Sequence, residues 1–320
     1  KPDDDGKMVL EFRSPADIKL QYANQPAGKT TMGAFWLAHA DRRAYMGVVF
    51  NPKMGREYPP NIFYPKKLVY NLWEGFQVPD TKGKWKLMRK HVWAILCNKD
   101  NVKFKYVMRW LAWSIQNPSE RAEVALVIKG KQGAGKGILF TQFKHIFGKH
   151  YMTISSSDHL TGKFNEHLRQ AVFLFADEAY DPKDRESESR LKQLITEPDI
   201  PIEGKFVNTI LAKNRLHIVM ATNNDRVIIA GEDTRRFFIN ETTNTYAMGQ
   251  GKNNKERTAY FTPIWKEMES GGRSAMLYDL KRINLGDWHP RSDIPETAEM
   301  KKQRRLQFNP ITAVLEYLEK

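Results

Sequence analysis

The chain has 320 residues, a formal charge of +14 at neutral pH and a sequence pI of about 9.6. A hydrophobic content of 41% with 12% aromatic residues is typical of a globular protein and excludes a disordered chain. No apolar run approaches the roughly 18 residues of a membrane helix, and a positive charge of this size favours a polyanionic partner such as DNA or RNA. The single cysteine, Cys97, lies in an apolar run; it excludes an intrachain disulfide framework and a multi-cysteine zinc site and indicates a reducing compartment.

The first part of the chain is polar and then rich in aromatic residues. Residues 1–30 are expected to form a linker, and residues 31–118 a smaller mixed α+β and helical domain that serves ring assembly or contacts DNA. Within residues 35–76, aromatic and turn residues alternate, which indicates short strands. Aromatic side chains such as Phe35 and Trp36 could stack on bases, but a core role is the better interpretation.

Helical spacing of apolar residues follows over 85–117. Pro118 predicts that this helical segment ends at the preceding residue, and we place a domain boundary near residues 117–122. The remainder divides into an ATPase domain, residues 119–285, and a basic helical C-terminal segment, residues 286–320.

A glycine-rich stretch forms the centre of the second domain. It follows an apolar run, 124–128, and leads into residues that can continue as a helix, which is the context of a phosphate-binding P-loop. Backbone N–H groups and a lysine there would surround phosphate oxygens. The residues expected to bind the nucleotide are Gly130, Lys131, Gln132, Gly133, Ala134, Gly135, Lys136, Gly137 and Ile138.

The P-loop pattern fails at its last position. Gly137 stands where a Ser or Thr hydroxyl normally coordinates Mg²⁺. We therefore expect Asp177 and phosphate oxygens to hold the metal ion, with water completing the coordination shell.

Asp177 and Glu178 end a second apolar run, 171–175, in the arrangement of a Walker B motif. The first carboxylate is expected to hold the metal side of the site, and the second to act as the base for an attacking water. The alternative is a strand followed by an acidic turn.

A third apolar run, 216–221, ends at Thr222, Asn223 and Asn224. An amide at this position could reach the γ-phosphate or the lytic water. Asn223 is the preferred candidate for this sensor and Asn224 the second choice, although asparagine pairs are also common in turns. The three apolar runs together predict an α/β fold with a parallel sheet.

Two arginines precede a fourth apolar stretch. Arg235, with Arg236 as its partner, is the candidate for an arginine finger that acts on the nucleotide of a neighbouring subunit. A surface salt bridge or a contact to a phosphate backbone are the alternatives.

Between the acids and the sensor run, Glu203-Gly204 predicts a hairpin turn. Lys205 and Phe206 would lie near its tip, where a cation and an aromatic ring suit a phosphate and a base of DNA. Lys192, just upstream, is a further candidate contact; a plain surface hairpin is the alternative.

In this order, the motifs resemble those of the superfamily 3 helicases, the AAA+-type motors of DNA viruses, phages and plasmids. The closer resemblance is to the helicase part of phage primase-helicases and primase-polymerases, including that of a deep-sea vent phage. It is carried by the stretches 71–76, 110–118, 130–137, 233–237 and 294–297 and covers roughly residues 35–300.

The resemblance implies an AAA+-like core, ATP and Mg²⁺ as cofactors, and a homo-oligomeric ring, usually hexameric, around single-stranded DNA. It implies the roles already given to Lys136, Asp177, Glu178, Asn223 and Arg235. It also implies a primase or polymerase domain in an N-terminal part outside this sequence, and the cytoplasm of a bacterial host as the location.

Two other functions remain open. A nucleoside monophosphate kinase shares the Gly-Ala-Gly-Lys-Gly stretch, but a Thr should follow where Ile138 stands. A DNA-binding or loading module with an inactive P-loop would account for Gly137.

Overall fold

The computed structural model describes residues 13–55, 57–58, 68–180, 185–204, 209–225, 227, 234–249 and 252–305. The described residues fall into two compact units. The first lies within residues 1–49 and 57–70, and the second within residues 50–56 and 71–320. In no described range is a helix both long and apolar enough to cross a membrane.

The first unit is a pair of short helices with small strands. Its elements are α1 (Pro15–Gln21), β1 (Pro26–Ala27), β2 (Thr30–Thr31), α2 (Met32–Ala38), β3 (Val48–Val49), β4 (Glu57–Tyr58) and β5 (Val69–Asn71). Ser14 starts α1 with a capping box, because its hydroxyl accepts from the Asp17 N–H at 3.1 Å while the Asp17 carboxylate accepts from the Ser14 N–H at 3.0 Å. The expected linker is therefore wrong for this segment, since local capping and a Pro at the first helical position favour a helix.

The aromatic residues of this part do not share one environment. Phe35 and Trp36 lie on α2 and are each 47% exposed, so the core interpretation is wrong for these two. The strand expectation is wrong for them as well. Trp73, in the second unit, is buried and stacks on His150 with ring centroids 4.7 Å apart, as a core residue should.

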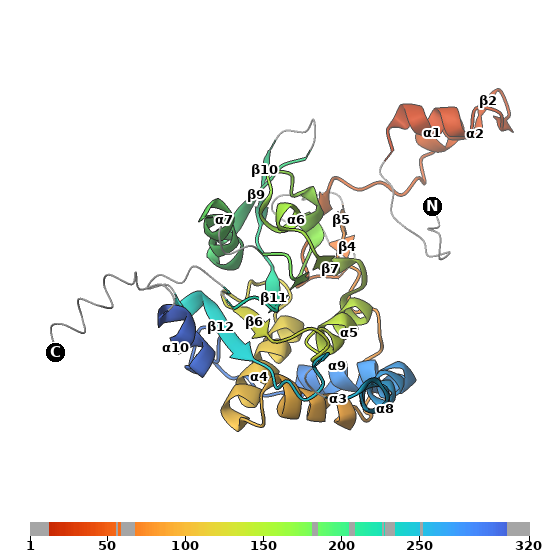
Figure 1. Ribbon diagram of the computed structural model, residues 1–320. Coiled ribbons are helices and arrows are strands. Elements are labelled where there is room, and N and C mark those ends of the chain that lie inside the picture. Colours follow the sequence, from red (N-terminus) through yellow and green to blue (C-terminus); the bar gives the residue numbers. More distant parts are fainter. Residues whose placement is uncertain are drawn as a thin grey trace, which may run out of the picture. The chain divides into compact units, whose positions relative to one another are not determined.

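The second unit is built on a five-stranded sheet in which every neighbouring pair is parallel (Figure 1). The spatial order of its strands is β12-β6-β11-β8-β7. The strands are β6 (Ala125–Lys129), β7 (Tyr151–Ile154), β8 (Phe173–Asp177), β11 (His217–Thr222) and β12 (Phe237–Glu241). The predicted parallel α/β sheet is thus confirmed, with β11 inserted between the strand before the P-loop and the strand before the two acids.

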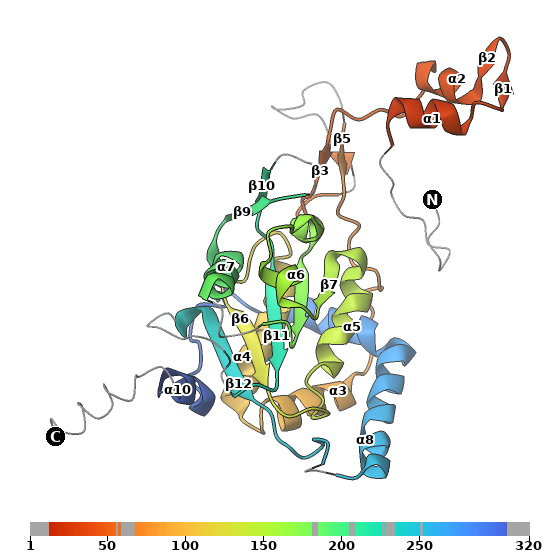
Figure 2. The same cartoon turned by 45° about the horizontal axis from the view of Figure 1, so that its top comes forward.

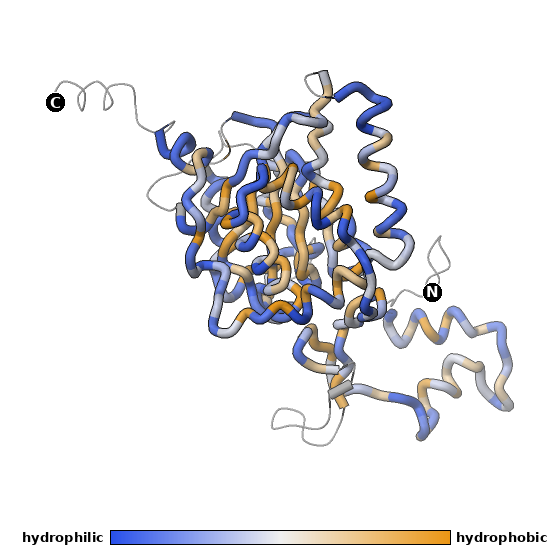
Figure 3. Tube along the Cα trace, turned by 90° about the horizontal axis from the view of Figure 1, so that it is seen from below, coloured by the Kyte–Doolittle hydropathy of each residue, from blue (hydrophilic) through white to orange (hydrophobic). Residues whose placement is uncertain are grey.

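Alternate residues of the strands pack on two different cores. Leu126 and Ile128 of β6 face a core that includes Phe140 and Trp110, whereas Ala125 and Val127 face the other core. Because parallel strands are covered on both faces, their side chains are apolar on both sides. Figure 3 shows this as hydrophobic strands inside a more hydrophilic outer layer.

The helices form a layer on each face of the sheet (Figure 2). The first layer contains α3 (Lys86–His91), α4 (Asn101–Gln116), α5 (Ile138–Phe147), α8 (Asn254–Glu267) and α9 (Arg273–Arg282). The second contains α6 (Ser157–Thr161), α7 (Arg185–Thr196) and α10 (Ala298–Arg305). Short helical turns are η1 (Val92–Leu96), η2 (Gly148–His150), η3 (Glu166–Gln170), η4 (Thr234–Arg236) and η5 (Met268–Gly272), and a hairpin is formed by β9 (Asp199–Ile202) and β10 (Ile210–Lys213).

The expected boundary near residues 117–122 is not where the described chain divides. The predicted helices over 85–117 are present, but they pack against the sheet. Trp110 of α4 donates its indole N–H to the Val124 carbonyl at 2.9 Å and packs its ring against Phe173. The residues from Asn71 onward therefore belong to the same unit as the glycine-rich stretch.

The basic C-terminal segment is helical over α10 and is joined to the sheet by a charge cluster around a buried lysine. Lys129, the last residue of β6, donates to Asp225 and Glu299, each at 3.1 Å. Burial alone would lower the pKa of Lys129, but these hydrogen bonds and the charges of Glu299 and Glu241 outweigh it and raise the pKa. The strand that precedes the P-loop is thereby fixed to α10.

Cys97 is fully buried, as the apolar run predicted. Burial raises the pKa of its thiol to about 12, so the thiol stays protonated and unreactive at neutral pH.

Candidate functional site: a cleft at one edge of the sheet

The glycine-rich stretch connects β6 to α5 as predicted. Gly133 and Gly135 have φ angles of +76° and +93°, a region that favours glycine. A Cβ atom on Gly133 would lie 2.5 Å from an Arg257 nitrogen, and one on Gly135 would lie 2.7 Å from the His91 ring. The loop therefore has a backbone shape and surroundings that exclude side chains at these two positions.

Lys136 lies inside this loop and is 7% exposed. Its ammonium donates to the carbonyls of Gly130 at 2.6 Å and Lys131 at 3.3 Å. Burial lowers the pKa of Lys136, and the nearby charges of Glu178 and Asp177 oppose that shift. The cation is thus held where phosphate oxygens, which are stronger acceptors than carbonyls, would meet it.

The two acids lie at the C-terminal end of β8 and face the same cleft. Gly133, Lys136, Asp177 and Glu178 are among the residues that line a cleft of about 500 Å³. Loss of hydration in the cleft raises the pKa of Asp177, which the charge of Lys136 partly offsets. Glu178 has a φ of +55°, an uncommon conformation for a residue with a side chain. Such backbone strain is concentrated at functional sites.

His91 and Tyr260, both outside the predicted motifs, form a hydrogen-bonded pair beside the glycine-rich loop. His91, at the end of α3, donates its Nε2–H to the Gly135 carbonyl at 3.0 Å, and its Nδ1 accepts from the Tyr260 hydroxyl at 3.2 Å. Because a carbonyl only accepts, this pair of bonds fixes the tautomer of the ring. Burial lowers the pKa of His91 to about 4, so the imidazole is neutral at physiological pH.

One stripe of α8 lies along the loop. Arg257, Phe261 and Trp265 are spaced four residues apart, which places them on one face of the helix. Arg257 donates to the Gly133 carbonyl at 3.4 Å, and Phe261 and Trp265 line the cleft. Trp265 is 37% exposed, so part of its ring is open to a ligand.

Gly137 begins α5 and offers no side chain to a metal ion. A Cβ atom built there would meet the Phe175 ring at 3.5 Å, which is an ordinary contact, so the space for a side chain exists. In the described ranges, no three His, Cys, Asp or Glu side chains are grouped so that they could hold a metal ion by themselves. The donor set therefore fits Mg²⁺ only when Asp177 is supplemented by phosphate oxygens and water.

The sensor candidates follow the strand between the P-loop strand and the acid strand. The end of β11 is hydrogen-bonded to both neighbours, since Gly130 N–H donates to Thr222 O at 3.0 Å and Glu178 N–H donates to Ala221 O at 2.9 Å. Asn223 and Asn224 come next and are exposed, but neither lines the cleft. Their sensor role stays a prediction, and Asn223 remains the nearer of the two to the strand end.

The two arginines lie at the other edge of the sheet. Phe237, the first residue of β12, pairs with Ala125, the first residue of β6, whereas the P-loop follows the last residue of β6. A five-residue strand is about 16 Å long, so Arg235 and Arg236 are about that far from the P-loop of their own chain. Arg236 instead donates to Thr196 at the end of α7 at 3.4 Å.

The hairpin predicted downstream of the acids is present, but its turn is longer than expected. Ile202 pairs with Ile210, so residues 203–209 connect the strands instead of a tight turn at Glu203-Gly204. Lys205 and Phe206 lie outside the described residues, and their DNA contact stays a prediction. Lys192 forms a salt bridge of 2.8 Å with Glu188 on the same helix.

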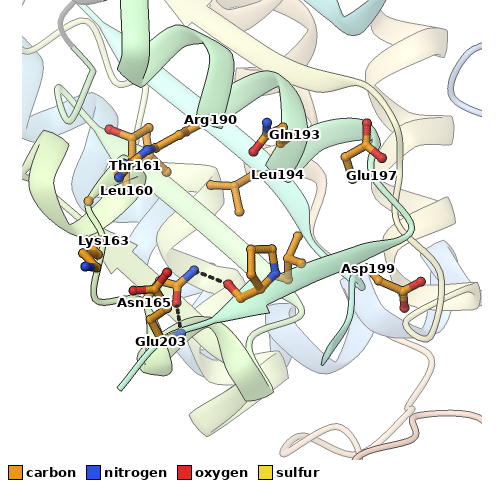
Figure 4. Close-up of a pocket in the computed structure, with 13 residues that line it drawn as sticks. Leu160, Thr161, Lys163, Asn165, Arg190, Gln193, Leu194, Glu197, Asp199 and Glu203 are labelled. Carbon is orange, nitrogen blue, oxygen red and sulfur yellow. Dashed lines mark hydrogen bonds between the residues drawn. The ribbon is translucent and has the colours of Figure 1, made fainter. Parts of the chain in front are cut away.

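A small pocket of about 260 Å³ lies at the base of this hairpin (Figure 4). Asn165 anchors β9 there, donating to the Pro201 carbonyl and accepting from the Glu203 N–H, each at 2.8 Å. Arg190 of α7 donates to the Thr161 carbonyl at 2.7 Å. The Asn165 bonds fix the base of the hairpin to the segment between α6 and η3, and the Arg190 bond joins α7 to α6.

The motifs therefore locate the cleft, but not its surroundings. The structure brings together Lys136, Asp177 and Glu178, and it separates them from Arg235 and Arg236 of the same chain. His91, Arg257, Phe261 and Trp265 were missed because they lie far from the P-loop in the sequence. The four-residue spacing of the last three was the one signal that could have pointed to a shared helix face.

Comparison with family models gives a match to residues 128–236, described as "Family of unknown function (DUF5906)". This region includes the P-loop, both acids, the asparagines and both arginines. The match covers less than half of the chain.

The DNA primase-polymerase of Nitratiruptor phage NrS-1 is 30% identical over 141 residues, which is 43% of this chain and 19% of that protein. An apo structure of the NrS-1 C-terminal region has a TM-score of 0.64 and 23% identity, covering 82% of this chain and 60% of that one. Another apo structure of that region has a TM-score of 0.66 and 20% identity, covering 85% of this chain and 62% of that one. The chain thus has the fold of that C-terminal region and is similar to a part, about a fifth by length, of a phage primase-polymerase.

Proposed function

We propose that this chain is an ATP-hydrolysing motor of a phage replication protein, of the superfamily 3 helicase type, that moves along single-stranded DNA. The observation that carries the proposal is the single cleft in which a P-loop lysine and two strand-end carboxylates converge. The position of β11 supports it, since its end is bonded to both the loop and Glu178. The similarity to part of a phage primase-polymerase agrees with a role in replication.

ATP would bind with its phosphates on the loop. Backbone N–H groups of the loop and the α5 N-terminus would receive the phosphate oxygens, and Lys136 would bind the β- and γ-phosphates. The base would then extend along α5 toward Trp265, whose partly exposed ring is the available stacking surface. His91 would keep the loop in shape through its bond to Gly135.

Hydrolysis needs a base, a charge partner for the phosphates and an in-line water. Asp177 and phosphate oxygens would hold Mg²⁺, which when bound neutralises charge on the β- and γ-phosphates. Glu178 would accept a proton from the water as its oxygen bonds to the γ-phosphorus and the bond to the β–γ bridging oxygen breaks. Asn223 would orient that water or contact the γ-phosphate. The products are ADP and phosphate.

The arginines would complete the site of a neighbouring subunit. At about 16 Å from their own P-loop, Arg235 and Arg236 are out of reach of a nucleotide bound there. A head-to-tail arrangement of copies presents the N-terminal edge of one sheet to the cleft of the next and closes as a ring, for which a hexamer is the expected size. Single-stranded DNA would pass through the ring, in contact with Lys205, Phe206 and Lys192.

One other function is favoured by a specific observation. Gly137 removes the hydroxyl that normally coordinates the metal ion, which suits a DNA-loading module that binds ATP without hydrolysing it. The loader and the motor make the same prediction for ATP binding and opposite predictions for hydrolysis.

The test is ATP hydrolysis with and without single-stranded DNA. The motor predicts DNA-stimulated hydrolysis that Lys136→Ala and Glu178→Gln abolish, with ATP binding lost in the first variant and kept in the second. ATP binding without hydrolysis in the wild type would replace the motor by the loader. Phosphoryl transfer to a nucleoside monophosphate, assayed in parallel, would identify a kinase instead.

A further inference from the structure

A second concave surface lies in the first helix layer, away from the nucleotide cleft. It is a groove of about 560 Å³ between α3, α4 and α9, and it shares no lining residue with the nucleotide cleft. Figure 1 shows these helices side by side below the sheet. We call it the basic groove; its polar lining residues are Arg89, Lys105, Arg109, Asp279, Arg282 and Asn284.

The charges of this groove are unbalanced. Four cationic side chains face one carboxylate, and that carboxylate, Asp279, already accepts the indole N–H of Trp85 at 2.7 Å. Arg282 is paired with Asp80 at 2.8 Å. In the part of the chain that the structure describes, no carboxylate lies within ion-pair distance of Arg89, Lys105 or Arg109.

Two of the three unpaired cations lie over aromatic rings. Arg89 lies over the Phe104 ring at 5.8 Å, and Arg109 lies over the Trp288 ring at the same distance. Lys105 and Arg109 are four residues apart on α4, so they project from one face of the helix, opposite Arg89 of α3. Stacking of this kind holds a guanidinium without neutralising its charge.

We propose that the basic groove binds the phosphodiester backbone of a single-stranded nucleic acid. Three unpaired cations on two helices, around one groove, present the positive charge that a run of phosphates requires. The groove would be a second contact with the single-stranded nucleic acid, besides the hairpin. This inference extends the proposed function, in which the chain moves along single-stranded DNA. Its binding test needs neither ATP nor hydrolysis.

Two sources of phosphate share this chemistry, a nucleic-acid backbone and a free polyphosphate. The cations line both sides of an open groove, two on α4 and one on α3, whereas a compact polyphosphate site would need donors converging on one point. We therefore assign the groove to the nucleic-acid backbone, and the experiment separates the two sources.

The experiment measures binding of the whole chain to a fluorescent oligothymidylate, without nucleotide, over a range of salt concentrations. The test variant carries Arg89→Gln, Lys105→Gln and Arg109→Gln. The matched control carries Lys90→Gln, Lys144→Gln and Lys266→Gln, which remove the same charge at exposed positions that do not line the groove. A second test variant, Arg89→Lys with Arg109→Lys, keeps the charge. Thermal unfolding and basal ATP hydrolysis check that each variant is folded.

The proposal predicts that the test variant binds the oligothymidylate about 10–100-fold more weakly at 0.1 M salt. The slope of log K against log salt concentration should be smaller in magnitude by about 2, because each of the three phosphate contacts contributes about 0.7. The control and the Lys variant should keep most of the affinity. Equal loss in test and control variants would overturn the proposal. Tripolyphosphate binding that the test variant loses, together with oligothymidylate binding that the test variant keeps, would overturn the assignment to nucleic acid. If the chain proves unable to hydrolyse ATP, the motor fails but this binding result stands.

Discussion

The C-terminal edge of the five-stranded sheet holds Lys136, Asp177 and Glu178 around one cleft, whereas the N-terminal edge holds Arg235 and Arg236. The first edge is supported by residues of the same chain: buried His91 and partly buried Phe261 lie against the glycine-rich loop. At the second edge, Arg235 is exposed at the start of β12. Under the proposed function, the cleft would bind a nucleotide within one chain, whereas the two arginines would act on a nucleotide that another copy holds.

The largest expected effect is on the N-terminal edge. Arg235→Ala should reduce ATP hydrolysis by about 10³–10⁵-fold, because an arginine finger stabilises transition-state charge by that much, and it should leave ATP affinity almost unchanged. Arg235→Lys is the control that keeps a charge but loses the planar fork, and it should be intermediate. An Arg235→Ala chain that still hydrolyses ATP at the wild-type rate would remove the distinction between the two edges.

The second effect is the pH dependence of stability that His91, which supports the C-terminal edge, should produce. His91 has a pKa of about 4 in the folded chain and about 6.5 when unfolded, so the unfolded chain binds more protons between these values. The contribution of His91 to the free energy of unfolding is therefore complete above about pH 6.5 and falls by up to about 3 kcal/mol as the pH decreases to 4. Urea unfolding at a series of pH values should show a flatter profile for His91→Gln than for the wild type.

Tyr260→Phe is the control for that measurement. It removes the hydroxyl from the His91 Nδ1 but keeps the imidazole, so the slope between pH 6.5 and 4 should remain. His217, whose pKa burial also lowers to about 4, should leave a residual slope in the His91→Gln variant. Identical profiles for His91→Gln and the wild type would show that His91 does not titrate as its burial requires.

The third effect tests where the base lies. Trp265→Ala should weaken ATP binding by about 1–3 kcal/mol, the range for one base stacked on an aromatic ring. Binding of tripolyphosphate, which has no base, should not change, and Trp265→Phe should recover most of the ATP affinity. Equal losses for ATP and tripolyphosphate in calorimetry would place the effect on the loop and not on the base.

The smallest effect concerns Gly137. Gly137→Ser fits beside Phe175 and restores an oxygen ligand, so the Mg²⁺ concentration for half-maximal hydrolysis should fall about tenfold. Gly137→Ala fills the same space without an oxygen and is the matched control. If both variants behave alike, the missing hydroxyl is not what limits metal binding at this edge.

Sequence reasoning was most successful where the chemistry is local. The P-loop, the two acids and the strand before Asn223 each occupy a few consecutive residues, and the parallel sheet followed from their apolar runs. It could not find His91 or the α8 stripe, since their contacts with the P-loop depend on how distant helices pack. It also misplaced Phe35 and Trp36 in a core, because the local sequence of a short helix does not show whether its aromatic side chains are buried or exposed.

Both arginines lie at the edge of the sheet opposite the P-loop, and only the strand pairing could show this. The sequence shows only that both arginines precede an apolar run. The pairing of Phe237 with Ala125 converts that into a distance of about one strand length, which is the separation that the predicted action on a neighbouring subunit requires.

The most direct test of this separation is a mixing experiment with two inactive variants. Glu178→Gln keeps the arginine edge and lacks the base, whereas Arg235→Ala keeps the cleft and lacks the finger. In an equal mixture that exchanges subunits, about a quarter of the head-to-tail interfaces join an intact cleft to an intact arginine. The account predicts that ATP hydrolysis returns to about that fraction of the wild-type rate. A mixture as inactive as its two components, with subunit exchange verified by labelled chains, would contradict it.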